Sequence, residues 1–130
     1  MLSYRARSAA PPAQAWSLVA RPARWHEWAP HVRGAWGLGD PEVKVGARGA
    51  ARLLGAVPVP AVVTAKDPGR SWTWEVGPVS LVHSVTPLGS GCEVAVEISA
   101  PGPLETVLGV SYGPLVGLLV RRLARVAEAA

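Results

Sequence analysis

The chain contains no phenylalanine, and its aromatic residues are six tryptophans and two tyrosines. Cysteine is nearly absent as well: Cys92 stands alone, which excludes an internal disulfide and a thiolate metal site. The three histidines, His26, His31 and His83, are not spaced as metal ligands, and no glycine-rich phosphate loop joins a strand to a helix. We therefore expect no metal and no cofactor.

Long hydrophobic segments and clustered charge are also missing. The N-terminal segment MLSYRARSAAPPAQAW lacks the continuous apolar core of a secretory signal, so we expect a cytoplasmic protein. The longest uncharged segment, residues 106–120, is interrupted by a Gly-Pro pair, which predicts no stable membrane insertion. The net charge is +4, but the arginines are scattered except for Arg121, Arg122 and Arg125. Without interleaved aromatic residues or a helix-turn-helix pattern, these arginines indicate a solvated face and no nucleic acid partner.

What remains is a composition typical of one folded domain, residues 1–130, with 49% hydrophobic and 17% charged residues. Residues 2–8 alternate apolar and polar, which predicts a strand. Two short helices are expected next, each with a proline near its start. The period then changes to two, and turn residues separate six further strands, which predicts an antiparallel meander. The expected helices are 12–21 and 22–28, and the expected strands are 32–38, 47–54, 57–66, 71–76, 79–87 and 92–99.

The C-terminal segment GPLETVLGVSYGPLVGLLVRRLARVAEAA predicts a long helix, either kinked at Gly113-Pro114 or divided there into two pieces. Its apolar positions fall on one side if the helix is continuous. The expected apolar side comprises Leu104, Val107, Leu108, Ser111, Leu115, Leu118, Leu119, Leu123 and Val126.

Four segments in this order carry a resemblance to a known family: AWSLVARPARWHEWAP, VGARGAARLLG, VTAKDPGRSWTWEV and VHSVTPLGSGCEVAVEI. With them the chain resembles the polyketide cyclase/dehydrase group of the START-related, birch-pollen-allergen-like (SRPBCC) superfamily over essentially its whole length. The resemblance implies an α+β helix-grip fold, in which a curved antiparallel sheet of about seven strands wraps around a long C-terminal helix. It also implies that a small apolar molecule is bound or processed between sheet and helix, and many members have no demonstrated chemistry.

Charged residues identify the solvent side of each expected strand, because successive side chains point to opposite faces. Glu75 then places Trp72 and Trp74 on the inner face, and Arg33 places Trp36 there. Further inner positions are Gly34, Ala47, Gly49, Ala51, Leu53, Ala61, Val63, Leu81, His83 and Val85. Lys66 and Thr64 are expected outside. A bulge near Gly77-Pro78 would reverse the faces of the strand that carries His83.

His83 is the best candidate for chemistry, since imidazole titrates near neutral pH and could move a proton in an aldol or dehydration step. It lacks an evident orienting partner, because Glu75 is expected on the far side of the sheet, and only Ser111 or Tyr112 could assist. We therefore assign no catalytic residue and treat His83 as a candidate. Trp16, Trp25 and Trp28 are expected to anchor the two short helices across the sheet opening.

The leading hypothesis is a binding protein for a small hydrophobic or aromatic molecule, polyketide-, lipid- or sterol-like, held in an internal cavity. The residues expected to bind it are Trp36, Trp72, Trp74, His83, Ser111 and Tyr112. The alternative is a polyketide cyclase or dehydratase that uses His83 as its acid/base. A second alternative is an interaction module that dimerises through the C-terminal helix, so the chain is expected as a monomer or homodimer. Enzymatic activity is left open and is not favoured.

Overall fold

Seven antiparallel strands form one curved sheet, in the order β1-β7-β6-β5-β4-β3-β2. The computed structural model describes residues 1–30, 32, 34–52 and 58–129. The strands are β1 (Leu2–Ser8), β2 (Gly34–Trp36), β3 (Arg48–Arg52), β4 (Pro58–Asp67), β5 (Ser71–Val76), β6 (Val79–Leu88) and β7 (Gly91–Ser99). Arg33 in the first of the six predicted strands, the predicted end of one strand at residue 54 and the predicted start of the next at residue 57 lie outside the described residues, as does His31. The predicted α+β helix-grip fold is confirmed.

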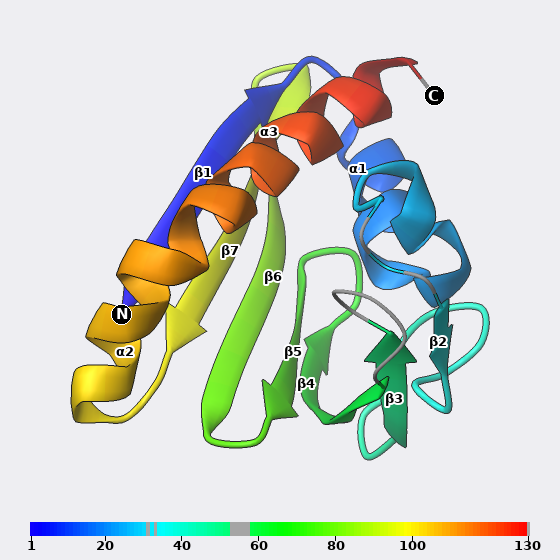
Figure 1. Ribbon diagram of the computed structural model, residues 1–130. Helices are drawn as coiled ribbons and strands as arrows, with labels where there is room; N and C mark the ends of the chain where they lie inside the picture. Colours follow the sequence, from blue (N-terminus) through cyan, green and yellow to red (C-terminus); the bar gives the residue numbers. More distant parts are fainter. Residues whose placement is uncertain (31, 33, 53–57, 130) are drawn as a thin grey trace.

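Four helical segments complete the domain: α1 (Pro12–Ala20), the 3-10 helix η1 (Pro22–Glu27), α2 (Gly102–Ser111) and α3 (Gly113–Ala129). Figure 1 shows α3 crossing β1 and β7, with its C-terminal end close to α1, and α2 beside the N-terminus. The two N-terminal helical segments lie together beside β2 at the other end of the sheet (Figure 1). The helices therefore cover one face of the sheet from two sides.

The hairpin of β5 and β6 has a continuous register from Ser71 opposite Ser84 to Val76 opposite Val79. Its turn is Gly77-Pro78, with Gly77 at φ 59°, so the left-handed conformation falls on a residue that adopts it without strain. No bulge lies at this turn. The inner face predicted for these two strands is therefore confirmed.

A register shift lies instead in β4, between Val63 and Ala65. It moves Lys66 opposite Trp72, onto the inner face, so the outward position predicted for Lys66 is wrong. The side chain of Lys66 is 18% exposed and pairs with Glu42, with Nζ 3.0 Å from Oε1. The partly exposed carboxylate of Glu42 thus compensates the charge that the bulge brings inward.

The side chains of β2 lie on the faces opposite to those predicted. Trp36 lies across from Ala50, and its side chain is 48% exposed, whereas Ala35 lies across from the buried Ala51 and packs on the core. Gly34 lies across from the exposed Arg52, so it too is on the outer face. Trp36 instead stacks under the Arg52 guanidinium, 5.6 Å from the ring centroid. The strand is a three-residue edge strand, too short for alternation to determine its faces.

The C-terminal helix is divided into α2 and α3, which are bent by 60° at Tyr112. Because of the bend, the single apolar side predicted for a continuous helix is wrong: Val107, Ser111 and Leu118 are exposed. The core face of α3 consists of Gly113, Val116, Val120, Leu123, Ala124 and Ala127. Three of these six residues are glycine or alanine, which lets α3 approach the sheet closely.

The end of α1 is held by tryptophan side chains. The last carbonyls of a helix have no partner within the helix. Here the Leu18 carbonyl accepts a hydrogen bond from Trp28 Nε1 at 2.9 Å. The Val19 carbonyl accepts two, from Trp25 Nε1 at 2.9 Å and from Trp72 Nε1 at 3.1 Å. The indoles therefore tie η1 and β5 to the same helix end, and the predicted anchoring role of Trp25 and Trp28 is confirmed.

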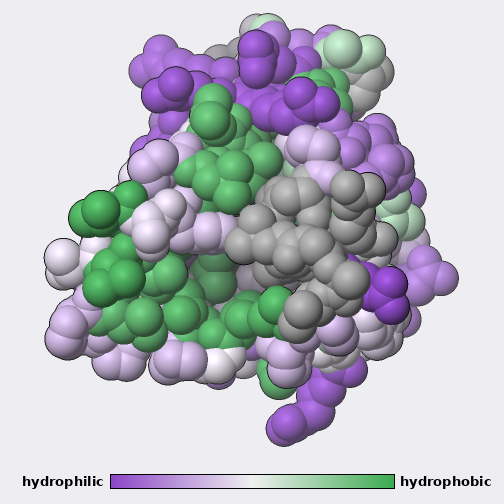
Figure 2. Space-filling model, viewed as in Figure 1, coloured by the Kyte–Doolittle hydropathy of each residue, from purple (hydrophilic) through white to green (hydrophobic). Residues whose placement is uncertain are grey.

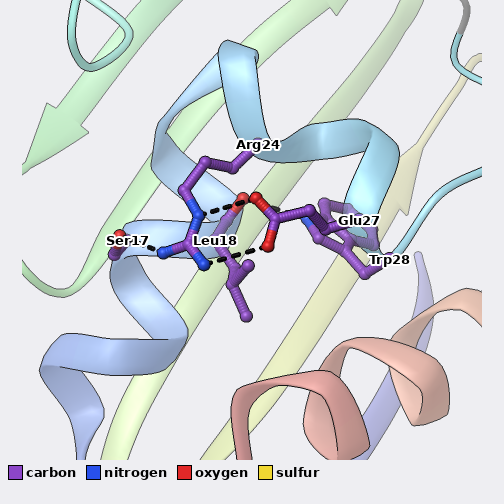
Figure 3. A network of polar contacts seen from close by, with 5 residues as sticks. All are labelled: Ser17, Leu18, Arg24, Glu27 and Trp28. Carbon is purple, nitrogen blue, oxygen red and sulfur yellow. Dashed lines mark hydrogen bonds and ion pairs between the residues drawn. The ribbon is translucent and has the colours of Figure 1, made fainter. Parts of the chain in front are cut away.

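An arginine adds a second connection between α1 and η1 (Figure 3). Arg24 donates two hydrogen bonds to the carboxylate of Glu27, at 2.8 and 3.0 Å, and one to Ser17 Oγ at 2.7 Å. The hydrogen bonds from Arg24 lower the pKa of Glu27. This network fixes the orientation of η1 and therefore of the two tryptophans that it carries.

Among the described residues, no single helix is long and apolar enough to cross a membrane. The pair α2 and α3 would suffice by length and composition only if the two bent segments are counted together.

A glycine substitution tests the contact between β2 and β3. A Cβ on Gly49 would meet the Trp36 carbonyl oxygen and the backbone of Gly37, whereas a Cβ on Gly34 meets no atom within 4 Å. We expect Gly49→Ala to lower the free energy of unfolding by about 1–3 kcal/mol, because backbone atoms must move apart. Gly34→Ala, on the neighbouring strand, should change it by less than about 0.5 kcal/mol. Urea denaturation of both variants measures the difference, and equal midpoints would contradict the contact.

Candidate functional site

A cavity of about 70 Å³ lies between the inner face of the sheet, η1 and the start of α3. Its walls are mostly aromatic and aliphatic. The lining residues are Trp25, Trp28, Ala29, Val32, Trp72, Trp74, Leu81, His83, Val96, Tyr112, Val116, Leu119 and Val120. In the view of Figure 2, hydrophobic residues gather on the left, where α2 and the start of α3 lie, and border a hollow beside them.

The hairpin of β5 and β6 places Trp72 and His83 directly opposite each other on the inner face, as predicted. Their rings stack with centroids 4.0 Å apart and an angle of 9° between planes. His83 is 7% exposed, and burial lowers its pKa to about 4. At neutral pH the imidazole is therefore uncharged, which suits a stacked position in an apolar wall.

One ring nitrogen of His83 has a backbone partner: Nδ1 lies 3.4 Å from the Trp72 carbonyl oxygen. A carbonyl oxygen only accepts, so the tautomer that satisfies this contact carries its proton on Nδ1 and leaves Nε2 as an acceptor. Glu75, the nearest carboxylate in sequence, is exposed and lies opposite Ser80, on the outer face. His83 and Glu75 are therefore on opposite faces of the sheet, as predicted, and do not form a catalytic pair.

Three tryptophans form one cluster against this histidine. Trp25 stacks on Trp72, with centroids 5.6 Å apart and an angle of 7°. Trp74 meets Trp25 and Trp72 edge to face, at 5.3 and 5.5 Å, and His83 at 6.0 Å. Such geometry is favourable for aromatic pairs. The cavity wall is therefore a rigid aromatic surface.

Four of the residues predicted to bind a ligand line the cavity together: Trp72, Trp74, His83 and Tyr112. Tyr112 is half-buried at the junction of α2 and α3, where burial raises the pKa of its hydroxyl. The other two predicted residues lie elsewhere. Trp36 is exposed on the outer face of β2, so its predicted inward position is wrong.

Ser111 is exposed on α2, and its hydroxyl donates to the Val107 carbonyl oxygen at 2.7 Å, one turn earlier. Its hydrogen bond is local to the helix, which is common for serine near a helix end. The prediction missed the cavity-lining role of Trp25 and Trp28. Their spacing of three residues on a short helix places both on one side, and this was the signal available in the sequence.

Metal and thiolate chemistry find no support in the part of the chain that the structure describes. No group of three or more His, Cys, Asp or Glu residues there could hold a metal ion. Cys92 is buried, and burial raises the pKa of its thiol. A thiol that stays protonated behaves as a small hydrophobic residue.

Solved structures share this fold across nearly the whole chain. MLL2253 from Mesorhizobium loti matches with a TM-score of 0.75 and 18% identity, covering 99% of this chain and 97% of that protein. Ara h 8.0201 matches with a TM-score of 0.68 and 14% identity, covering 99% of this chain and 97% of that one. DynU16, described as a putative protein in the dynemicin biosynthetic locus, matches with a TM-score of 0.70 and 22% identity over 94% of this chain and 46% of its own.

At these identities the likeness concerns the fold. No curated protein sequence matches the chain. A family model does: "Polyketide cyclase / dehydrase and lipid transport" covers residues 2–129. The chain therefore belongs to the polyketide cyclase/dehydrase and lipid transport family.

Proposed function

We propose that the protein binds a small hydrophobic or aromatic molecule in the cavity between the sheet and α3. The observation that carries this proposal is the aromatic wall of Trp25, Trp72 and Trp74, which lines a cavity beside an apolar stretch of α3. No charged side chain is among the described residues that line the cavity, since His83 is neutral. Concave sites with aromatic walls and a few polar atoms are typical of small-molecule binding.

The volume of the cavity restricts the size of the ligand. Sites for drug-sized molecules measure about 300–1,000 Å³, whereas this cavity measures about 70 Å³. Of the polyketide-, lipid- and sterol-like ligands predicted from the sequence, those built on a compact ring system therefore need the least widening. A sterol or a long acyl chain requires α3 or η1 to move away from the sheet.

Filling the cavity should abolish binding. Val116 is 5% exposed and lines the cavity, whereas Leu118 on the same helix is 59% exposed. We expect compact aromatic compounds to raise the melting temperature of the wild type by preferential binding to the folded state. Val116→Phe should remove this increase, and Leu118→Phe should keep it. Thermal shift with native mass spectrometry measures both effects; an equal response of the two variants, or no response of the wild type to aromatic, fatty acid and sterol panels, would refute the proposal.

The enzymatic alternative rests on His83, which lines the cavity and is unprotonated at neutral pH. As a base in a cyclisation or dehydration it would take a proton at Nε2. A pKa of about 4 makes this imidazole a weak base, so ligand binding is the better supported function.

A variant pair decides whether His83 has a catalytic role. If the protein cyclises or dehydrates a poly-β-ketone substrate through His83, then His83→Ala and His83→Gln should abolish turnover while the circular dichroism spectrum stays that of a folded protein. Unchanged turnover in the two variants would remove His83 from the mechanism. A raised KM with unchanged kcat would assign His83 to binding alone.

The buried imidazole also predicts an acid-sensitive fold. Its pKa is about 4 in the folded state and about 6.5 in the unfolded chain, so the unfolded state binds the proton more readily between these values. The stability contributed by neutral His83 is fully present above pH 6.5 and is lost as the pH falls toward 4, by up to about 3 kcal/mol.

This loss is measured by urea denaturation at several pH values. His83→Gln should flatten the dependence in that window, because glutamine does not titrate. His26→Gln, a substitution of an exposed histidine, is the matched control and should keep the wild-type slope. Parallel slopes for wild type and His83→Gln would contradict the burial of a neutral imidazole.

The dimerisation alternative has a different structural basis. Helix α2 contains no buried residue, and Val107 and Val110 on it are 58% and 78% exposed. Single exposed apolar residues are common on monomers. We therefore retain pairing through the C-terminal helices as a third proposal, behind ligand binding and catalysis.

A further inference from the structure

A second concave surface, which we call the arginine groove, lies between β1 and α3. Its lining residues are Ala6, Arg7, Leu118, Arg121, Ala124 and Arg125. Strand β1 is an edge strand of the sheet, and Figure 1 shows α3 crossing it. The groove has a volume of about 420 Å³. Sites for drug-sized molecules measure about 300–1,000 Å³, so the groove, unlike the internal cavity, already has room for a ligand.

Three exposed arginines from two elements line this groove. Arg121 and Arg125 are four residues apart on α3, so their side chains leave the same face of the helix. Like charges at this spacing repel each other, and Arg7 on β1 adds a third positive charge. The sequence predicts a solvated face for Arg121 and Arg125, and the structure adds the contribution of β1 and the concave shape.

The carboxylates near this groove have other partners. Glu93 lies directly opposite Arg7 in the sheet, but its Oε1 accepts a hydrogen bond from Arg5 at 2.9 Å. Glu128, near the end of α3, accepts a hydrogen bond from the Ala9 amide at 2.6 Å. Neither carboxylate neutralises an arginine of the groove.

The guanidinium groups of the groove are free to bind another molecule. Within the part of the chain that the structure describes, no hydrogen bond or ion pair involves the side chain of Arg7, Arg121 or Arg125. By contrast, Arg5 and Arg24 each bind a carboxylate of this chain. The groove therefore combines space for a ligand with three uncompensated cations.

The charge and geometry of these cations favour a phosphate group. Guanidinium groups bind carboxylate and phosphate through paired N–H···O bonds. A carboxylate carries a single negative charge, whereas a phosphate monoester carries about −1.5 to −2 at pH 7 and offers three acceptor oxygens. The phosphate therefore matches three arginines better. Apolar atoms of Ala6, Leu118 and Ala124 lie in the same groove, and Leu118 is 59% exposed.

We propose that the arginine groove binds a phosphate monoester that carries a short apolar substituent. Arg7, Arg121 and Arg125 bind the phosphate oxygens, and Leu118 contacts the substituent. The phosphate group belongs to a soluble molecule or to a lipid head group, and both present the same chemistry to the groove. This site shares no lining residue with the internal cavity and does not depend on the ligand proposed there.

Butyl phosphate, inorganic phosphate and 1-butanol separate the charge from the apolar contact. In protein labelled with ¹⁵N, butyl phosphate should move the Nε–H resonances of the three arginines, whereas 1-butanol should leave them in place. Each resonance is assigned by its absence from the spectrum of the corresponding Arg→Gln variant. Titration of these shifts gives the dissociation constants. We expect butyl phosphate to bind about 3-fold more tightly than inorganic phosphate, because its chain covers apolar surface.

Three variants of α3 provide the matched comparison. Arg121→Gln and Arg125→Gln each remove one guanidinium from the groove. Arg122→Gln removes the same charge from the same helix, and Arg122 is not among the described residues that line the groove. We expect the dissociation constant of butyl phosphate to rise about 3- to 10-fold in the first two variants and to change by less than about 2-fold in Arg122→Gln.

Vesicle sedimentation separates the two sources of phosphate. Phosphatidylcholine vesicles are compared with and without phosphatidic acid, whose head group is a phosphate monoester. Sedimentation that requires phosphatidic acid, and that Arg125→Gln weakens more than Arg122→Gln does, would identify a lipid head group. If butyl phosphate binds in the groove and the protein does not sediment with either vesicle, the ligand is a soluble phosphate monoester.

Two results would overturn the proposal. Arginine resonances that stay in place with both inorganic phosphate and butyl phosphate would show that the groove binds no phosphate. An equal loss of affinity in all three variants would show that the probe responds to the net charge of α3 and not to the groove. Both results leave the proposed binding of an apolar molecule in the internal cavity unaffected.

Discussion

The hydrogen bonds from three indoles to the last turn of α1 determine how the two ends of the domain fit together. Helix α1 ends at Ala20, is followed by Arg21-Pro22, and has no glycine there to turn the chain back over its carbonyls. Tryptophans from η1 and β5 fill this role for Leu18 and Val19, and the Val43 amide does so for Ala20, at 3.0 Å. Phenylalanine has no N–H and could not make these bonds, which explains why the aromatic core uses tryptophan.

The shape of the cavity follows from the same bonds. Each indole that reaches back to α1 presents its ring surface to the interior, and His83 completes the wall by stacking on Trp72. Because large rings occupy most of the volume between the sheet and α3, the cavity that remains is small. Trp74 packs edge-on against the cluster without a helix carbonyl to bond to, and its N–H stays buried without a partner. The same indoles therefore cap the end of α1 and form the wall of the cavity.

Sequence reasoning succeeded where charged residues mark the faces of long strands. Glu75 correctly placed Trp72 and Trp74 inside, and the register across the turn brought His83 opposite Trp72. It failed on short or irregular elements. Strand β2 has three residues, and its only charged marker, Arg33, lies outside the described residues. The bulge in β4 puts Lys66 on the inner face instead of the predicted outer face, and an extra residue of this kind cannot be recognised in an alternating pattern.

The properties of the candidate site depended on distances that no pattern encodes. The volume of the cavity, the break between α2 and α3 at Tyr112, and the partners of the indole nitrogens all arise from packing between segments far apart in the chain. The alternation rule gives the direction of a side chain, and it does not say whether its polar atom reaches an acceptor. The residues of the site were thus largely predictable, and its size and polarity were not.

The two walls of the cavity differ in how freely their residues can be substituted. Changing Trp25 or Trp72 removes one of the two hydrogen bonds that the Val19 carbonyl accepts at the end of α1, so this wall can vary only at a cost to folding. On the opposite wall, Val116 and Leu119 meet the cavity through aliphatic atoms alone and have no such second task. Substitutions that reshape the cavity should therefore accumulate along α3, while the tryptophan wall stays the same.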